Sequence, residues 1–124
     1  MTEVDTELDL FAQRQPEACQ LAKAVSLAAR VEPEVLRAVR LQLPELDAGS
    51  EADVWFSPFV ESANAVAMTF KADAAAALRR RLAREHDRNY ISRIWSIINR
   101  IHEHASNPIR LIERLTWLAL TNNS

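Results

Sequence analysis

The residues best suited to metal binding or proton transfer are three histidines, His86, His102 and His104. His102 and His104 stand two positions apart. On a helix this spacing turns the two rings about 200° away from each other, so they cannot share one metal ion as an i, i+4 pair could. We therefore interpret residues 102–104 as the polar end of an amphipathic helix, and we expect no metal site and no catalytic histidine.

Carboxylates stand in pairs at two places, Glu45 with Asp47 and Glu51 with Asp53. Paired carboxylates can act as general acid and base. Both pairs lie in the turn-rich segment 44–53, where acidic side chains commonly cap helices and stay hydrated. The chain also lacks a glycine-rich phosphate loop and the Gly-x-Ser-x-Gly and His-Glu-x-x-His motifs. We therefore predict no catalytic residues, no cofactor and a function that is not enzymatic.

A cluster of arginines is the strongest group of like charge, and it consists of Arg79, Arg80, Arg81 and Arg84. Neighbouring arginines can neutralise phosphates. Three consecutive residues spread over about 200° of a helix, however, so they do not form one face. The net charge of −2 also disfavours a nucleic-acid partner. We expect these arginines to stay solvated or to pair with acidic residues, and nucleic-acid binding is a less favoured alternative.

Charge is distributed unevenly, because residues 1–62 carry a net −7 and residues 63–124 a net +5. Such asymmetry can steer a partner or favour head-to-tail self-association, unless the two halves pack side by side. We expect the partner to be another protein or a further domain of the same longer chain, with self-association as a third option.

Cys19 is the single cysteine, so it can form neither an intrachain disulfide nor a cysteine-based zinc site, and we expect a small buried side chain. No apolar run approaches the roughly 18–20 residues that span a bilayer. The N-terminus is acidic where a secretory signal would be basic. These features predict a cytoplasmic protein with no membrane contact.

The elements that must position these groups are helices. Only one glycine, Gly49, occurs in 124 residues, which removes the residue that hairpins usually need. Pro16, Pro33 and Pro108 suit the first turns of helices. We predict an all-α single domain over 1–124, a bundle of about five or six helices with a fraying segment at 1–15 and a polar tail at 121–124.

Two predicted helices near the C-terminus carry the clearest apolar faces. The first starts at 87–89, and we predict that it is the central helix of the core. Its apolar stripe consists of Ile91, Ile94, Trp95, Ile98 and Ile101. In the helix after Asn107, we predict a broad inner face made of Ile109, Leu111, Ile112, Leu115, Trp117, Leu118, Ala119 and Leu120.

The segment 44–70 is the one region where helical periodicity fails. Residues 51–55 suit a short helical turn, residues 54–56 alone would suit an extended piece, and alternation at 66–70 predicts a short strand, so a small two-stranded element is expected here. Aromatic side chains beside acidic ones are typical of interfaces. The candidate partner-binding residues are Glu51, Asp53, Trp55, Phe56 and Phe59. The competing interpretation is that Trp55 and Phe56 plug one end of the bundle.

Three stretches resemble an uncharacterised helical module of large bacterial multidomain proteins, namely 31–40 (VEPEVLRAVR), 52–58 (ADVWFSP) and 115–120 (LTWLAL). The resemblance covers about residues 18–121. In those proteins the module accompanies formylglycine-generating-enzyme-like, protease, repeat or NTPase domains of conflict and signalling systems. The resemblance implies an accessory or recruiting domain, either an excised module or a stand-alone partner, and it transfers no functional residues.

A sensor of small ligands is the main alternative to a protein-interaction domain. Such a protein needs a pocket with a few convergent polar groups. The residues that would line it are Trp55, Phe59 and Trp95.

Overall fold

The chain folds into helices with one small hairpin between them. The computed structural model describes residues 2–122, and within that range there are seven helices and two strands. Their order is α1 (Glu3–Arg14), α2 (Pro16–Val25), α3 (Pro33–Leu41), α4 (Gly49–Trp55), β1 (Val60–Ala63), β2 (Met68–Phe70), α5 (Ala72–Glu85), α6 (Arg88–Ile101) and α7 (Asn107–Thr121). The predicted all-α class is confirmed, and the short α4 brings the number of helices to seven.

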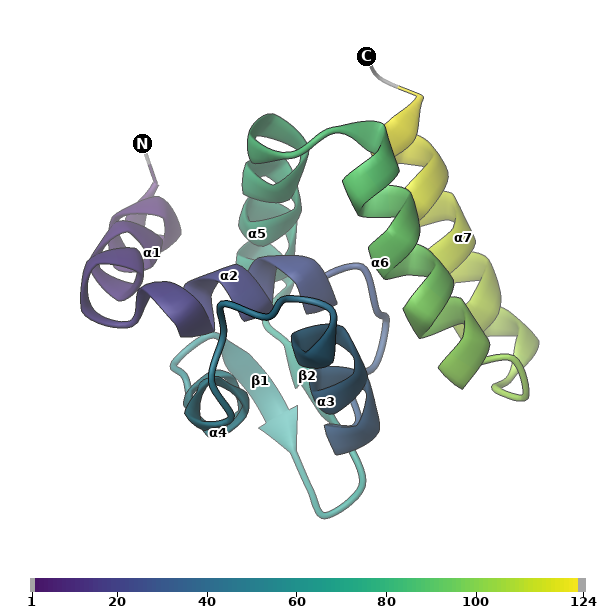
Figure 1. Ribbon diagram of the computed structural model, residues 1–124, viewed down its shortest axis with the longest axis horizontal. Helices are drawn as coiled ribbons and strands as arrows, with labels where there is room; N and C mark the ends of the chain where they lie inside the picture. The colour runs from purple at the N-terminus through teal and green to yellow at the C-terminus, as the bar shows by residue number, and fades with distance from the viewer. Residues whose placement is uncertain (1, 123–124) are drawn as a thin grey trace.

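Helix α2 lies at the centre of the molecule (Figure 1). It contacts α1, α3, α4, α5 and α6. Every residue from 21 to 28 is buried. Several of these residues are alanines, and small side chains allow neighbouring helices to approach closely. The other helices therefore pack around α2, with α1 at one end of the molecule and the α6–α7 pair at the other (Figure 1).

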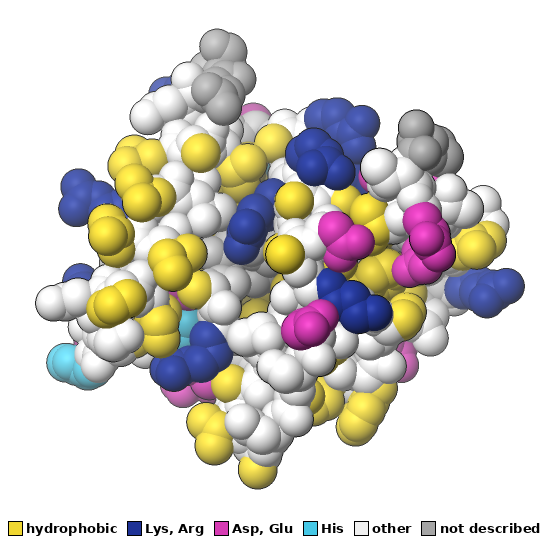
Figure 2. Space-filling view, turned by 180° about the vertical axis from the view of Figure 1, so that it is seen from behind, with side chains coloured by type: hydrophobic (Ala, Val, Ile, Leu, Met, Phe, Trp, Pro, Cys, Tyr) yellow, Lys and Arg dark blue, Asp and Glu magenta, His cyan; other side chains and the backbone are white. Residues whose placement is uncertain are grey.

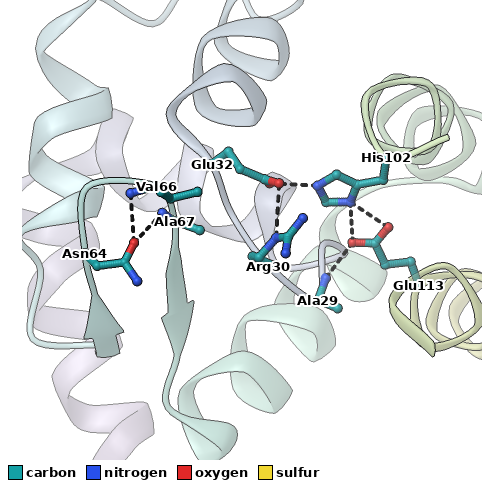
Figure 3. A network of polar contacts seen from close by, with 8 residues as sticks. All are labelled: Ala29, Arg30, Glu32, Asn64, Val66, Ala67, His102 and Glu113. Carbon is teal, nitrogen blue, oxygen red and sulfur yellow. Dashed lines mark hydrogen bonds and ion pairs between the residues drawn. The ribbon is translucent and has the colours of Figure 1, made fainter. Parts of the chain in front are cut away.

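The segment 44–70 contains both a helix and the hairpin. Val54 is fully buried, and residues 54–56 close the short helix α4 instead of forming a strand. The antiparallel partner of β2 is β1, with Val60 opposite Phe70 and Ala63 opposite Met68. Pro58 separates α4 from β1, because a proline cannot continue the helix. The hairpin turn is closed by Asn64, whose Oδ1 accepts hydrogen bonds from the backbone N–H groups of Val66 and Ala67 (Figure 3).

Helix α6 buries Ile91, Ile94 and Ile98 of the predicted stripe in the core, whereas Trp95 and Ile101 are only partly buried. The predicted inner face of α7 is wrong in part, because Ile112 and Leu115 are 51% and 56% exposed. Helix α7 packs mainly on α6, with a smaller contact to α5 and a hydrogen bond from the loop after α2, so a narrow strip of its surface is covered. The buried residues of α7 are polar, Glu113 and Thr121.

The start of the described chain agrees with standard capping chemistry. Thr2 and Asp5 form a capping box at the start of α1. Thr121, expected to begin a polar tail, instead closes α7, and residues 123 and 124 of that predicted tail lie outside the described residues. No helix between residues 2 and 122 is both long enough and apolar enough to cross a membrane.

Candidate interaction surfaces

The predicted partner-binding segment divides into exposed and structural residues. Phe56 is 82% exposed, and Asp53 is exposed as well. Phe59 is buried in the core, where its ring packs edge-on against another aromatic ring. Glu51 forms an ion pair with an arginine of α3, and Trp55 is half-buried against the core. Asp53 and Phe56 are therefore the members of this set that a partner can reach most directly.

A groove of about 520 Å³ lies beside Phe56, between α1 and the turn after α4. Its apolar lining is Leu10, Phe11, Phe56, Pro58 and Phe59. A smaller hollow of about 210 Å³ continues it toward the start of α5. We call the two together the α1–α4 groove.

The charged lining of the α1–α4 groove is predominantly acidic. Four exposed carboxylates stand against two cationic side chains, an excess of two negative charges; the carboxylates are Glu3, Glu7, Asp53 and Asp73, and the cations are Arg14 and Lys71. None of the four carboxylates forms an ion pair with another residue in the part of the chain that the structure describes. The groove therefore combines an apolar floor with unneutralised negative charge.

The outer side of α7 is an apolar surface with positive charge. Leu111, Ile112 and Leu115 are each more than half exposed. Arg110 and Arg114 lie on the same helix, and neither guanidinium has a hydrogen bond or ion pair with any residue in 2–122. Figure 2 shows hydrophobic side chains gathered over α7, with acidic side chains mainly on the opposite side, over and beside α1. We call these five residues the α7 face.

A shallow groove of about 360 Å³ runs along the α7 face, between α6 and α7. Trp95 and Trp117 stack in it with ring centroids 4.4 Å apart. The indole Nε1–H of Trp117 donates a hydrogen bond to Ser92 Oγ at 3.0 Å, whereas Nε1 of Trp95 is buried without a partner among the described residues. No acidic side chain lines this groove, so the groove, like the α7 face, favours a negatively charged partner.

His102 is the centre of a buried polar network beneath α7 (Figure 3). Its Nδ1 lies 2.8 Å from Oε2 of Glu113, and its Nε2 lies 2.7 Å from Oε1 of Glu32. Glu113 also accepts a hydrogen bond from the backbone N–H of Ala29, at 2.7 Å, and Glu32 accepts one from Nε of Arg30. The network therefore ties α7 and the end of α6 to the loop between α2 and α3.

The placement of His102 corrects the interpretation of residues 102–104 as a polar helix end. His102 is only 2% exposed, while His104 is open to solvent. The hydrogen bond to Glu113 raises the pKa of His102 above its usual range; burial opposes this, and the hydrogen bond to Glu32 adds to it. A protonated ring donates from both nitrogens, so both are satisfied by carboxylates. No lone pair of this ring is then left for a metal ion.

Residues 2–122 contain no group of three or more His, Cys, Asp and Glu side chains placed to hold a metal ion. Cys19 is buried as predicted, and burial raises the pKa of its thiol. A raised pKa keeps the thiol protonated, which makes it a poor nucleophile.

The arginines of α5 point in different directions, because Arg79 and Arg81 bond to different parts of the chain. Nε of Arg79 donates to the carbonyl of Ser26 at 2.8 Å. Arg81 turns toward α1, where it lies 3.0 Å from Asp9 and 3.6 Å from Asp5. Of the two expected states, solvated or paired with acidic residues, Arg81 therefore adopts the paired one.

A groove of about 1010 Å³ lies between α1, α5 and the ends of α6 and α7. Four arginines and four carboxylates line it, so it carries no excess of positive charge; they are Arg80, Arg81, Arg84, Arg88, Asp5, Asp9, Glu85 and Asp87. Binding to a phosphate backbone depends on such an excess. The groove therefore does not favour a nucleic-acid partner.

The aromatic residues considered for a ligand pocket lie apart. Phe59 lines the α1–α4 groove, Trp95 lines the groove of α6 and α7, and Trp55 packs on the core beside α4. The described chain does not bring the three into one cavity. A small-ligand site built from them is not formed.

Comparison of the chain with protein-family models, with curated proteins and with solved structures gives no match.

Proposed function

We propose that this chain is a protein-interaction domain that recruits a partner without catalysing a reaction, and that the α7 face is its binding surface. The observation that carries the proposal is the orientation of α7. A surface helix normally turns its apolar residues toward the core and its charged residues toward water. In α7, Leu111, Ile112 and Leu115 face solvent, while the carboxylate of Glu113 is buried.

The composition of the α7 face supports binding to protein. Exposed apolar patches with a polar or charged rim are typical of interaction sites. Aromatic and arginine side chains dominate the energetics of interfaces, and the face joins Arg110 and Arg114 to the stacked Trp95 and Trp117. Because no acidic side chain lines the groove between α6 and α7, the surface favours a partner segment that carries carboxylates.

An accessory role agrees with the resemblance of the sequence to helical modules of bacterial multidomain proteins. Such a module would act as an adaptor for an effector domain, in the same chain or in another one. A cytoplasmic site of action is part of this proposal.

The test is affinity capture from the native host with three forms of the chain. The parent, the double variant Leu111→Ser/Leu115→Ser and the control Leu41→Ser would be compared, because Leu41 is an exposed leucine of α3, 61% accessible. We expect the parent and the control to capture the same protein, and the double variant to lose it. Bound proteins would be identified by mass spectrometry.

Thermal melts of all three forms show whether a loss of capture comes from unfolding. Asp53→Lys would be included to test the α1–α4 groove as the alternative binding surface, since Asp53 is exposed. The proposal fails if the double variant is folded and captures the partner as well as the parent does.

A further inference from the structure

We propose that the α7 face of one copy docks into the α1–α4 groove of a second copy, so that the chain assembles head to tail. This inference rests on the proposed function, because it takes the α7 face to be a binding surface and names its occupant. The two surfaces are complementary in apolar character and in charge.

The apolar parts of the two surfaces complement each other. The α7 face presents aliphatic side chains, Leu111 and Leu115, one helical turn apart on a convex helix. The α1–α4 groove presents a hollow of about 520 Å³ next to Phe56 and Leu10, which are 82% and 44% exposed. A closed cavity of about 150 Å³ already holds a benzene molecule, so the groove has room for more than one aliphatic side chain. Docking would remove both exposed patches from water.

The charges of the two surfaces are opposite. The α7 face carries Arg110 and Arg114, neither of which has a partner within residues 2–122. The α1–α4 groove has an excess of two carboxylates, and those at its rim include Glu7 and Asp53. Opposite charges at the rim of an interface steer the encounter and fix the register of the partners. The same asymmetry appears over the whole chain, in the net −7 of residues 1–62 and the net +5 of residues 63–124.

The position of the two surfaces makes the contact heterologous. Helix α1 lies at one end of the long axis of the molecule and α7 near the other (Figure 1). A copy that uses its α7 face still has its own groove free for the next copy. Head to tail, such a contact does not close after two subunits and builds a ring or an open chain, whereas a reciprocal antiparallel pair would stop at the dimer.

Pairing of α7 with α7 is the main alternative arrangement, and its charges are unfavourable. An isologous contact would bring Arg110 and Arg114 of both copies together. The one carboxylate of α7, Glu113, is buried and bonded to His102, so it cannot neutralise them. Like charges facing each other across an interface cost free energy.

The experiment measures the mass of the protein by light scattering and analytical ultracentrifugation at increasing concentration and low salt. We expect the average mass of the parent to rise past twice the 14.0 kDa monomer. Salt should reduce the association, because exposed charges are screened. Two variants each remove one surface: Leu115→Asp on the α7 face and Phe56→Ser in the groove. Each should remain a monomer by itself, and thermal melts establish that both are folded.

The decisive sample is an equimolar mixture of the two variants. Leu115→Asp keeps an intact groove and Phe56→Ser keeps an intact α7 face, so a head-to-tail contact predicts a dimer of the two and nothing larger. The control Leu41→Ser should associate like the parent.

Three results would overturn the inference. The first is a parent that stays monomeric at every concentration, the second is a folded Leu115→Asp variant that still assembles, and the third is a mixture that stays monomeric. If the parent is monomeric but the α7 face still captures a host protein, the proposed function stands and this inference is wrong.

Discussion

The imidazole Nδ1 of His102 lies 2.8 Å from Oε2 of Glu113, which joins the end of α6 to the middle of α7 through a buried hydrogen bond. Because Glu113 is drawn inward, the residues on the opposite side of α7 must face solvent. A polar contact thus determines which side of the last helix is available for binding. This relationship yields the first prediction.

The stability contributed by His102 should depend on pH. Its pKa is raised in the folded state, so the contribution is complete at pH values below 6.5, the ordinary value, and is lost as the pH rises through the folded-state pKa. Just below pH 6.5, His102→Gln should lower the free energy of unfolding by about 3–5 kcal/mol, as expected when a buried pair loses one partner. The check is urea unfolding of parent and variant over a pH series. A difference that grows as the pH rises would contradict the prediction.

Ile98 and Leu115 should differ sharply in their effect on stability. Ile98 is fully buried in α6, so Ile98→Ala should cost about 2–5 kcal/mol. Leu115→Ala is the matched change at an exposed position, and it should cost less than about 0.5 kcal/mol. Both values come from urea denaturation at a protein concentration where the chain is monomeric. A small loss for Ile98→Ala would show that the α6 stripe is not the core.

Arg81 should hold α1 on the bundle. Its guanidinium group contacts both Asp5 and Asp9, and it also donates to the backbone carbonyl of Asp5 at 3.0 Å. Arg81→Ala should lower the free energy of unfolding by about 1.5–3 kcal/mol, the range for hydrogen bonds to charged groups. It should also speed amide hydrogen exchange in α1. Arg84→Ala is the control, since Arg84 is exposed and contacts neither aspartate; equal exchange in the two variants would rule out this anchor.

Chelating agents should leave the melting temperature unchanged. The described residues hold no group of side chains arranged for a metal ion, and both ring nitrogens of His102 are engaged by carboxylates. The measurement is a thermal melt with and without chelator. A clear fall in the melting temperature would reveal a metal site that contributes to folding.

The helices could be predicted from the sequence where local signals agree. Proline at the first turn marks α3, as at Pro33, and a regular apolar stripe marks α6, as at Ile98. The orientation of α7 could not be predicted from the sequence. Ile112 and Leu115 outweigh one carboxylate when hydrophobicity is summed over the helix. The signal that was present is positional: Glu113 lies four residues from both Ile109 and Trp117, and His102 lies four residues after Ile98.

Five candidate partner-binding residues near α4 could be named from the sequence, but which of them are exposed could not be predicted. Phe56 and Phe59 are three positions apart in one irregular stretch, yet one is exposed and the other is in the core. The difference depends on the turn after α4 and on the ring of Phe11, 5.2 Å from that of Phe59. The pairing of Glu51 with Arg40 likewise depends on how α3 and α4 pack. Such tertiary contacts have no local sequence signal.

The burial of α2 has a consequence for biosynthesis. This helix is made before α5 and α6, which form part of its cover, and the buried Lys23 pairs with Glu85, 62 positions later in the chain. Until those helices have left the ribosome, the apolar side chains of Val25 and Leu27 remain open to water. Nascent chains with such exposed surface are prone to aggregation. A growing chain that stalls before α6 therefore displays its future core, the kind of surface that chaperones bind.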